Sequence, residues 1–118
     1  MDDTTQPTID RATFDELKET AGAQFAVELV DTFLAEAPVM LSELRSAFAA
    51  GNADTFRRAA HSLKSNGATF GARAFATMAR DLELGGLAAA QAAACAPLEG
   101  LTEEYARVVT ALMELKHA

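Results

Sequence analysis

The chain has 118 residues and a formal net charge of −7, with 17 acidic side chains against 10 Lys and Arg. Half of the residues are hydrophobic, which is enough for the core of one domain and argues against intrinsic disorder. The acidic balance argues against a nucleic-acid binder, which needs a basic surface, and the sequence holds no run of about 18 apolar residues that would span a membrane.

Helix is the predicted structure along almost the whole chain, because Ala is abundant, Gly and Pro are few, and β-branched residues do not cluster. Residues 1–8 are polar and are expected to form a flexible tail, whose acidic start is the opposite of a secretory signal. Residues 9–118 are expected to form one helical domain without an internal linker.

Two helices are predicted in the first half of the chain. Asp10 or Thr13 caps a short helix, which ends at Ala21-Gly22. A long helix follows, and Pro38 inside it predicts either a kink or a restart. Gly51-Asn52 ends this long helix and caps the next one. The apolar residues of the long helix recur at spacings of three and four: Phe25, Leu29, Phe33, Leu34, Leu41, Leu44 and Phe48.

Three further helices are predicted in the second half. The third helix runs from about Ala53 to Phe70, and Gly71 separates it from a fourth helix that ends at Gly85-Gly86. The last helix opens with an Ala-rich stretch, in which Pro97 marks either a kink or the true start. Its apolar residues alternate four and three apart: Ala94, Leu98, Leu101, Tyr105, Val108, Leu112 and Leu115. The inward residues of the third and fourth helices are Phe56, Ala60, Leu63, Gly67, Phe70, Phe75, Met78, Ala79 and Leu82.

The predicted fold is therefore all-α: an antiparallel four-helix bundle with a short additional N-terminal helix. Five helices can cover their own core, so a monomer is expected. The continuous apolar seam from Ala94 to Leu115 leaves pairing between two chains open as an alternative.

Neither the histidine spacing nor the cysteine predicts a metal or redox site. Glu114 and His117 form a single Glu-x-x-His, the pair that di-iron bundles use twice, and no second copy is present. Cys95 has no companion for a disulfide, which fits a reducing compartment, and it is expected to be a small buried or half-buried apolar residue. We therefore expect a cytoplasmic protein with no metal ion and no cofactor.

His61 is the candidate reactive residue. It lies midway along the third predicted helix, about 100° round from the apolar face, with Arg57 one turn before it and Lys64 and Ser65 one turn after it. Two cations and a hydroxyl would suit a phosphoryl group on His61 Nε2. The spacing alone also fits an ordinary solvated helix face, on which Arg57 only pairs with Asp54.

The segment Ala60–Ala72, AHSLKSNGATFGA, resembles the signature of histidine-containing phosphotransfer (HPt) domains. Leu82-Glu83 is similar to the L-E/Q pair that this family carries downstream. The segment 33–38 and Gly51-Asn52 resemble its second helix and the following turn. The resemblance extends over about residues 9–116 and implies the same helical bundle.

The resemblance implies a role for each matching residue. His61 would accept the phosphoryl group, Lys64 would neutralise the phosphoryl oxygens, and Ser65 stands where Gly is more common in the family. Gly67 and Ala68 would keep the approach to His61 open for a partner, although Gly67 equally fits a packing point between helices.

Glu83 matches the family position that accepts a hydrogen bond from the Nδ1 of the histidine. The turn at Gly71 follows His61 by ten residues and precedes Glu83 by twelve, so an antiparallel hairpin would place the two side chains side by side. A fixed Nδ1–H leaves Nε2 as the nucleophile. The alternative for Glu83 is a solvated acid near a helix end.

The resemblance also implies a phosphorelay carrier, which takes a phosphoryl group from the phospho-aspartate of one receiver domain and passes it to another. The expected partners are receiver domains of response regulators and a hybrid sensor histidine kinase, and Mg²⁺ would belong to the receiver. The docking surface would use Ala68 and Met40, rimmed by Arg57, Lys64 and Arg73.

Three observations bear on other functions. The sequence has no Gly-rich nucleotide loop followed by Lys-Ser/Thr, so neither ATP binding nor autophosphorylation is expected. One alternative is an interaction module that binds a receiver or kinase without carrying phosphate, but the intact His-x-x-Lys pattern argues against it. Another is a fragment of a larger kinase, although a chain that begins at Met1 favours a stand-alone protein.

Overall fold

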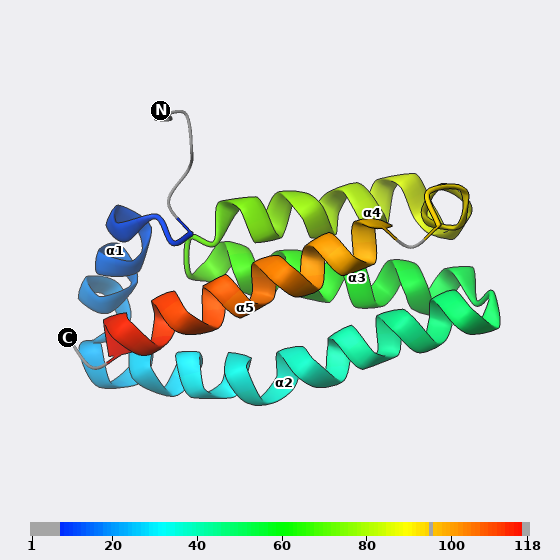
Figure 1. Ribbon diagram of the computed structural model, residues 1–118. Coiled ribbons are helices and arrows are strands. Elements are labelled where there is room, and N and C mark those ends of the chain that lie inside the picture. Colours follow the sequence, from blue (N-terminus) through cyan, green and yellow to red (C-terminus); the bar gives the residue numbers. More distant parts are fainter. Residues whose placement is uncertain (1–7, 95, 117–118) are drawn as a thin grey trace, which may run out of the picture.

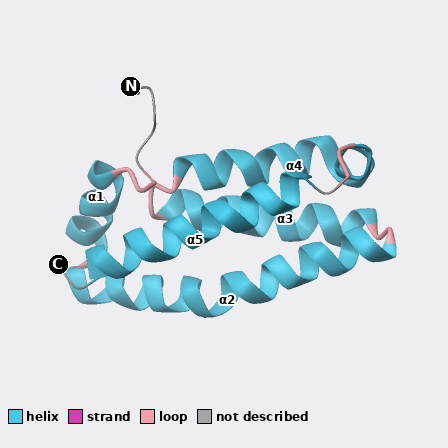
Figure 2. Cartoon of the chain, viewed as in Figure 1, coloured by secondary structure: helices cyan, strands magenta, loops and turns pink. Residues whose placement is uncertain are grey.

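The computed structural model describes residues 8–94 and 96–116, and the regular structure of these residues is helical throughout (Figures 1 and 2). Helices α2 to α5 lie alongside one another, and the short α1 crosses the end of the bundle where α2 begins. The predicted four-helix bundle with an additional N-terminal helix is confirmed. The helices are α1 (Arg11–Ala21), α2 (Ala23–Ala50), α3 (Ala53–Thr69), α4 (Arg73–Ala92) and α5 (Ala96–Lys116).

The predicted helix boundaries in the first half of the chain are confirmed. Gly22, with φ of 96°, separates α1 from α2, and Gly51 ends α2 in the left-handed conformation that glycine adopts without strain. Asn52 caps α3, because its side-chain oxygen accepts a hydrogen bond from the backbone N–H of Thr55 at 3.1 Å. Asp10 occupies the N-cap position of α1, where its carboxylate accepts a hydrogen bond from the Thr13 hydroxyl.

Two features of α2 go beyond or against the sequence prediction. Of the kink or restart predicted at Pro38, the restart is excluded, because the helix continues through this residue, with buried core residues on either side at Phe33 and Leu41. Phe25 is half exposed and lies outside the core, because the buried stripe of α2 starts from Ala26 and leaves Phe25 about 100° round the helix.

The boundary between the last two helices also differs from the prediction. Helix α4 does not end at Gly85-Gly86: the backbone bends at Gly86, with φ of 77°, and a second helical arm continues to Ala92. Figure 1 shows this arm, in yellow, end on. Its Leu87 is buried against the bundle, which explains why the chain stays helical. Ala94 lies exposed in the connection with φ of 54°, not in the seam of α5, and Pro97 stands in the first turn of α5.

The core is built around an aromatic cluster. Phe33 of α2 contacts Phe70, Phe75 and Tyr105, with ring centroids 5.4 to 6.2 Å apart. Burial of a side chain as large as Phe75 contributes about 1.5–3 kcal/mol. The cluster joins α2, α4 and α5 to the turn after α3, and it fixes which face of each helix remains outside.

Some predictions lie outside the described residues, namely those for the tail up to residue 7, for Cys95 and for His117. Among the residues that are described, no helix is long and apolar enough to cross a membrane.

Candidate functional site

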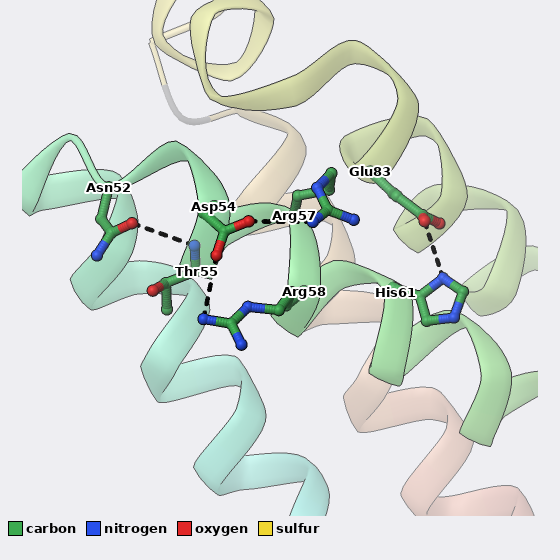
Figure 3. A network of polar contacts seen from close by, with 7 residues as sticks. All are labelled: Asn52, Asp54, Thr55, Arg57, Arg58, His61 and Glu83. Carbon is green, nitrogen blue, oxygen red and sulfur yellow. Dashed lines mark hydrogen bonds and ion pairs between the residues drawn. The ribbon is translucent and has the colours of Figure 1, made fainter.

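His61 lies on the outer face of α3, where the sequence pattern predicted it. Ala60, Leu63 and Gly67 turn into the core, so the imidazole is left on the surface with 54% of its side chain exposed. The antiparallel α4 runs beside α3, and it brings Glu83 to the same level (Figure 3).

A hydrogen bond joins His61 to Glu83, with 2.8 Å between Nδ1 and Oε2. Because a carboxylate accepts, the contact selects the neutral tautomer in which Nδ1 carries the proton and Nε2 keeps its lone pair. Figure 3 shows Nδ1 turned toward Glu83, which leaves Nε2 on the side of the ring that faces away. The prediction that the hairpin places the two side chains side by side is confirmed.

Lys64 binds the same carboxylate from its other side. Its Nζ lies 3.1 Å from Oε1 of Glu83, whose side chain is 14% exposed. The Lys64 ammonium, followed by the hydrogen bond from His61, lowers the pKa of the Glu83 carboxyl below its ordinary value. Glu83 is therefore an anion at neutral pH, and the Lys64 ammonium is engaged with it beside the imidazole.

Two arginines lie on the other side of His61, toward the start of α3. Asp54 binds both: Arg57 Nη2 is 3.0 Å from Oδ1, and Arg58 Nη2 is 3.1 Å from Oδ2 (Figure 3). The pairing of Arg57 with Asp54, which the helical spacing offered, is confirmed. The two arginines border a hollow that is also lined by His61, Ser62 and Glu83.

The remaining predicted residues lie at different depths. Ser65 and Ala68 are exposed on α3, one and two turns beyond His61. Met40 of α2 is partly buried, and its sulfur lies 3.8 Å from the side-chain nitrogen of Asn66. These residues continue the surface of α3 from the imidazole toward α2.

Gly67, which was expected to keep the approach to His61 open, is buried where α3 packs against α4. A Cβ at this position would lie 2.7 Å from Cδ2 of Phe75. The glycine allows the two helices to approach closely, which is the packing interpretation that the sequence left open.

Arg73, which the sequence analysis expects at the rim of the docking surface, is the first residue of α4. Its guanidinium lies 2.9 Å from the carboxylate of Asp10, at the turn between α3 and α4. Ten residues of α4 separate it from Glu83, about 15 Å along the helix axis. Arg73 therefore ties the start of α1 to this turn.

Sequence reasoning missed Arg58 and Ser62, which line the hollow together with His61. The signal for Arg58 was its position four residues after Asp54, which is the spacing of a helical ion pair. Ser62 carried no such signal, because its place depends on how α2 packs against α3.

No group of three or more metal-ligating side chains is found among residues 8–94 and 96–116. Near His61, the carboxylate of Glu83 is already bound by the Lys64 ammonium, which would repel a cation.

An exposed imidazole, oriented by a carboxylate on the neighbouring helix of a four-helix bundle, presents Nε2 as an accessible nucleophile. The family model of the Hpt domain matches residues 28–111, which is most of the chain. The chain belongs to the Hpt domain family, whose members are phosphocarriers of two-component relays that interact with receiver domains and kinases.

A solved structure supports the same assignment. The crystal structure of histidine-containing phosphotransfer protein B (HptB) from Pseudomonas aeruginosa PAO1 is similar to this chain, with a TM-score of 0.86 and 26% sequence identity. The match covers 96% of this chain and 97% of that one. No curated protein sequence matches the chain significantly.

Proposed function

We propose that His61 accepts a phosphoryl group from the phospho-aspartate of a receiver domain and passes it to a second receiver domain. The single observation that carries this proposal is the hydrogen bond between His61 Nδ1 and Glu83, on an imidazole that is otherwise exposed. A surface histidine without a role has no need of a partly buried carboxylate that fixes its tautomer.

The proposed transfer is an in-line displacement at phosphorus. The Nε2 lone pair forms the new N–P bond, the bond from phosphorus to the aspartyl oxygen breaks, and the aspartate leaves as a carboxylate. The imidazole becomes positively charged, with its Nδ1 proton retained, and the Glu83 carboxylate stabilises that charge. Donation to the second receiver is the same step in reverse.

The other residues of the site would position the partner and the phosphoryl group. Ser65, exposed one turn beyond His61, would donate a hydrogen bond to phosphoryl oxygens, and Lys64 would supply positive charge beside the imidazole. Ala68 and Met40 would border the docked receiver, and Arg57 would face its acidic mouth. Mg²⁺ would come with the receiver. The sequence also has no Gly-rich nucleotide motif, so ATP is not expected to take part.

Further features of the proposal concern the whole protein. We place it in the cytoplasm, where receiver domains work, as a monomer that neither binds ATP nor phosphorylates itself. A binding-only module remains the alternative function, and the two differ in one observable, which is covalent phosphate on His61.

The deciding experiment mixes the protein with a phosphorylated receiver domain and Mg²⁺, using the wild type and His61→Gln side by side. The wild type should acquire label that is stable in base and lost in acid, and His61→Gln should acquire none while keeping its helical circular dichroism. Label retained by His61→Gln would overturn the assignment. Receiver binding without any label would leave the binding-only module.

A further inference from the structure

Asp54 holds both arginines that precede His61 on α3. Each oxygen of its carboxylate binds one guanidinium, so Arg57 and Arg58 are directed back toward the start of the helix (Figure 3). All three side chains are more than half exposed, and none belongs to the core.

These two ion pairs are of the kind that a partner can displace. They join neighbouring turns of one helix in solvent, where water and salt weaken them. Because the arginines do not pack in the core, their side chains can turn without disturbing the bundle. Asp54 itself lies in the first turn of α3, where the helix dipole favours an acid.

The two arginines lie between His61 and the surface that α2 and α3 form together. Both line the hollow beside the imidazole. Arg58 and Ser62 also line a groove between α2 and α3, whose α2 side carries Ser42, Ser46 and the acidic Glu43. A domain that reaches His61 from this side meets both guanidiniums.

The charge of the whole chain makes this cation pair important for docking. At a net charge of −7, the protein repels an acidic partner at long range. A receiver domain presents carboxylates around its phospho-aspartate, and a guanidinium offers a planar fork of donors that matches a carboxylate. The Lys64 ammonium, which Glu83 holds, is a point charge and offers no such fork.

We propose that Arg57 and Arg58 bind the acidic rim of the incoming receiver, and that Asp54 is a built-in competitor from which they must first be released. This inference rests on the proposed function and adds a partner-recognition device to it. Asp54 then sets how tightly the carrier binds: strongly enough for transfer, and weakly enough for the carrier to leave for the second receiver.

The test measures receiver affinity and transfer rate for the wild type, Asp54→Asn and the double variant Arg57→Ala/Arg58→Ala. The receiver is one that phosphorylates the wild type, and affinity is measured by calorimetry with its trifluoroberyllate adduct. Asp15→Asn is the matched control, because it removes the exposed i,i+4 partner of Arg11 on α1, away from His61.

Asp54→Asn should tighten receiver binding about threefold at low salt, and high salt should abolish the gain. The double variant should lose about tenfold or more, and Asp15→Asn should match the wild type. Unchanged or weaker binding by Asp54→Asn overturns the inference, as does full affinity of the double variant. If the wild type takes phosphate normally in either case, the proposed function stands and only this inference fails.

Discussion

Lys64 and His61, one turn apart on α3, bind opposite oxygens of one carboxylate on α4. The ammonium lies 3.1 Å from Glu83 Oε1, and the imidazole Nδ1 lies 2.8 Å from Oε2. Lys64 thus holds the Glu83 carboxylate in place, and this carboxylate orients the His61 ring. Lys64 also brings positive charge to the site. The three side chains act as one unit, so changes to them are not expected to be additive.

Lys64→Ala should slow phosphoryl transfer to His61 by about an order of magnitude while the protein stays folded. The substitution removes a charge near the phosphoryl group and leaves buried Oε1 of Glu83 without its cation. Rapid-quench measurement of labelled protein would give the rate. Lys18→Ala on α1 is the control, and equal rates for the two variants would remove Lys64 from the mechanism.

Replacements of Glu83 should separate its hydrogen bond from its charge. Glu83→Gln keeps an oxygen that accepts from Nδ1, so its transfer rate should fall less than that of Glu83→Ala, which loses about tenfold or more. Nitrogen NMR of His61 reports the tautomer directly. The Nδ1–H form should dominate in the wild type and in Glu83→Gln, and it should lose that dominance in Glu83→Ala. An unchanged tautomer in Glu83→Ala would show that the carboxylate does not orient the ring.

Gly67→Ala should destabilise the bundle, because the added Cβ would lie 2.7 Å from the buried ring of Phe75. We expect a loss of about 1–2 kcal/mol in unfolding free energy, after the gain in helix propensity is set against the overpacking. Gly100→Ala on α5 is the matched control: its Cβ would meet nothing within 4 Å, so it should stabilise by about 0.5–1 kcal/mol. Urea unfolding of both variants measures these changes in unfolding free energy. Equal stabilisation by the two would contradict the packing role of Gly67.

The sequence pattern was sufficient for the parts of the molecule that depend on local periodicity. The apolar face of α3 placed His61 outside, and the Gly51-Asn52 and Gly71 signals set the hairpins that bring Glu83 beside it. These features follow from helical geometry and from the conformational preferences of single residues.

Other features depend on tertiary contacts that no local pattern encodes. The burial of Leu87 continues α4 beyond Gly86, where glycine alone signalled an end. The depth of Gly67 is set by Phe75, and the partner of Arg73 is Asp10 from a distant part of the chain. The role of a small or charged residue is therefore ambiguous in the sequence, because its neighbours in the fold determine whether it packs inside or binds a partner.

A pH-dependent clamp is expected where α1 meets the turn between α3 and α4. The hydrogen bond from the Thr13 hydroxyl lowers the pKa of the Asp10 carboxyl from its ordinary 3.8. The positive charge of the Arg73 guanidinium, 2.9 Å from this carboxylate, lowers the pKa further. The backbone N–H of Asp10 also donates to the carbonyl of Gly71 at 2.8 Å. A carboxyl whose pKa is lower in the folded state stabilises the fold above its ordinary pKa, and this contribution is lost as the pH falls through the folded value.

Asp10→Asn should therefore lower the thermal midpoint at pH 7, and the difference from the wild type should shrink as the pH falls below about 4. Arg73→Ala should also lower the midpoint at pH 7, but it should leave transfer to His61 unchanged, because it lies about 15 Å along α4 from Glu83. Thermal unfolding at several pH values and the receiver assay test both statements. A stability difference that stays constant down to pH 2 would contradict the pH-dependent clamp. Slower transfer by a folded Arg73→Ala would support the predicted place of Arg73 at the rim of the docking surface.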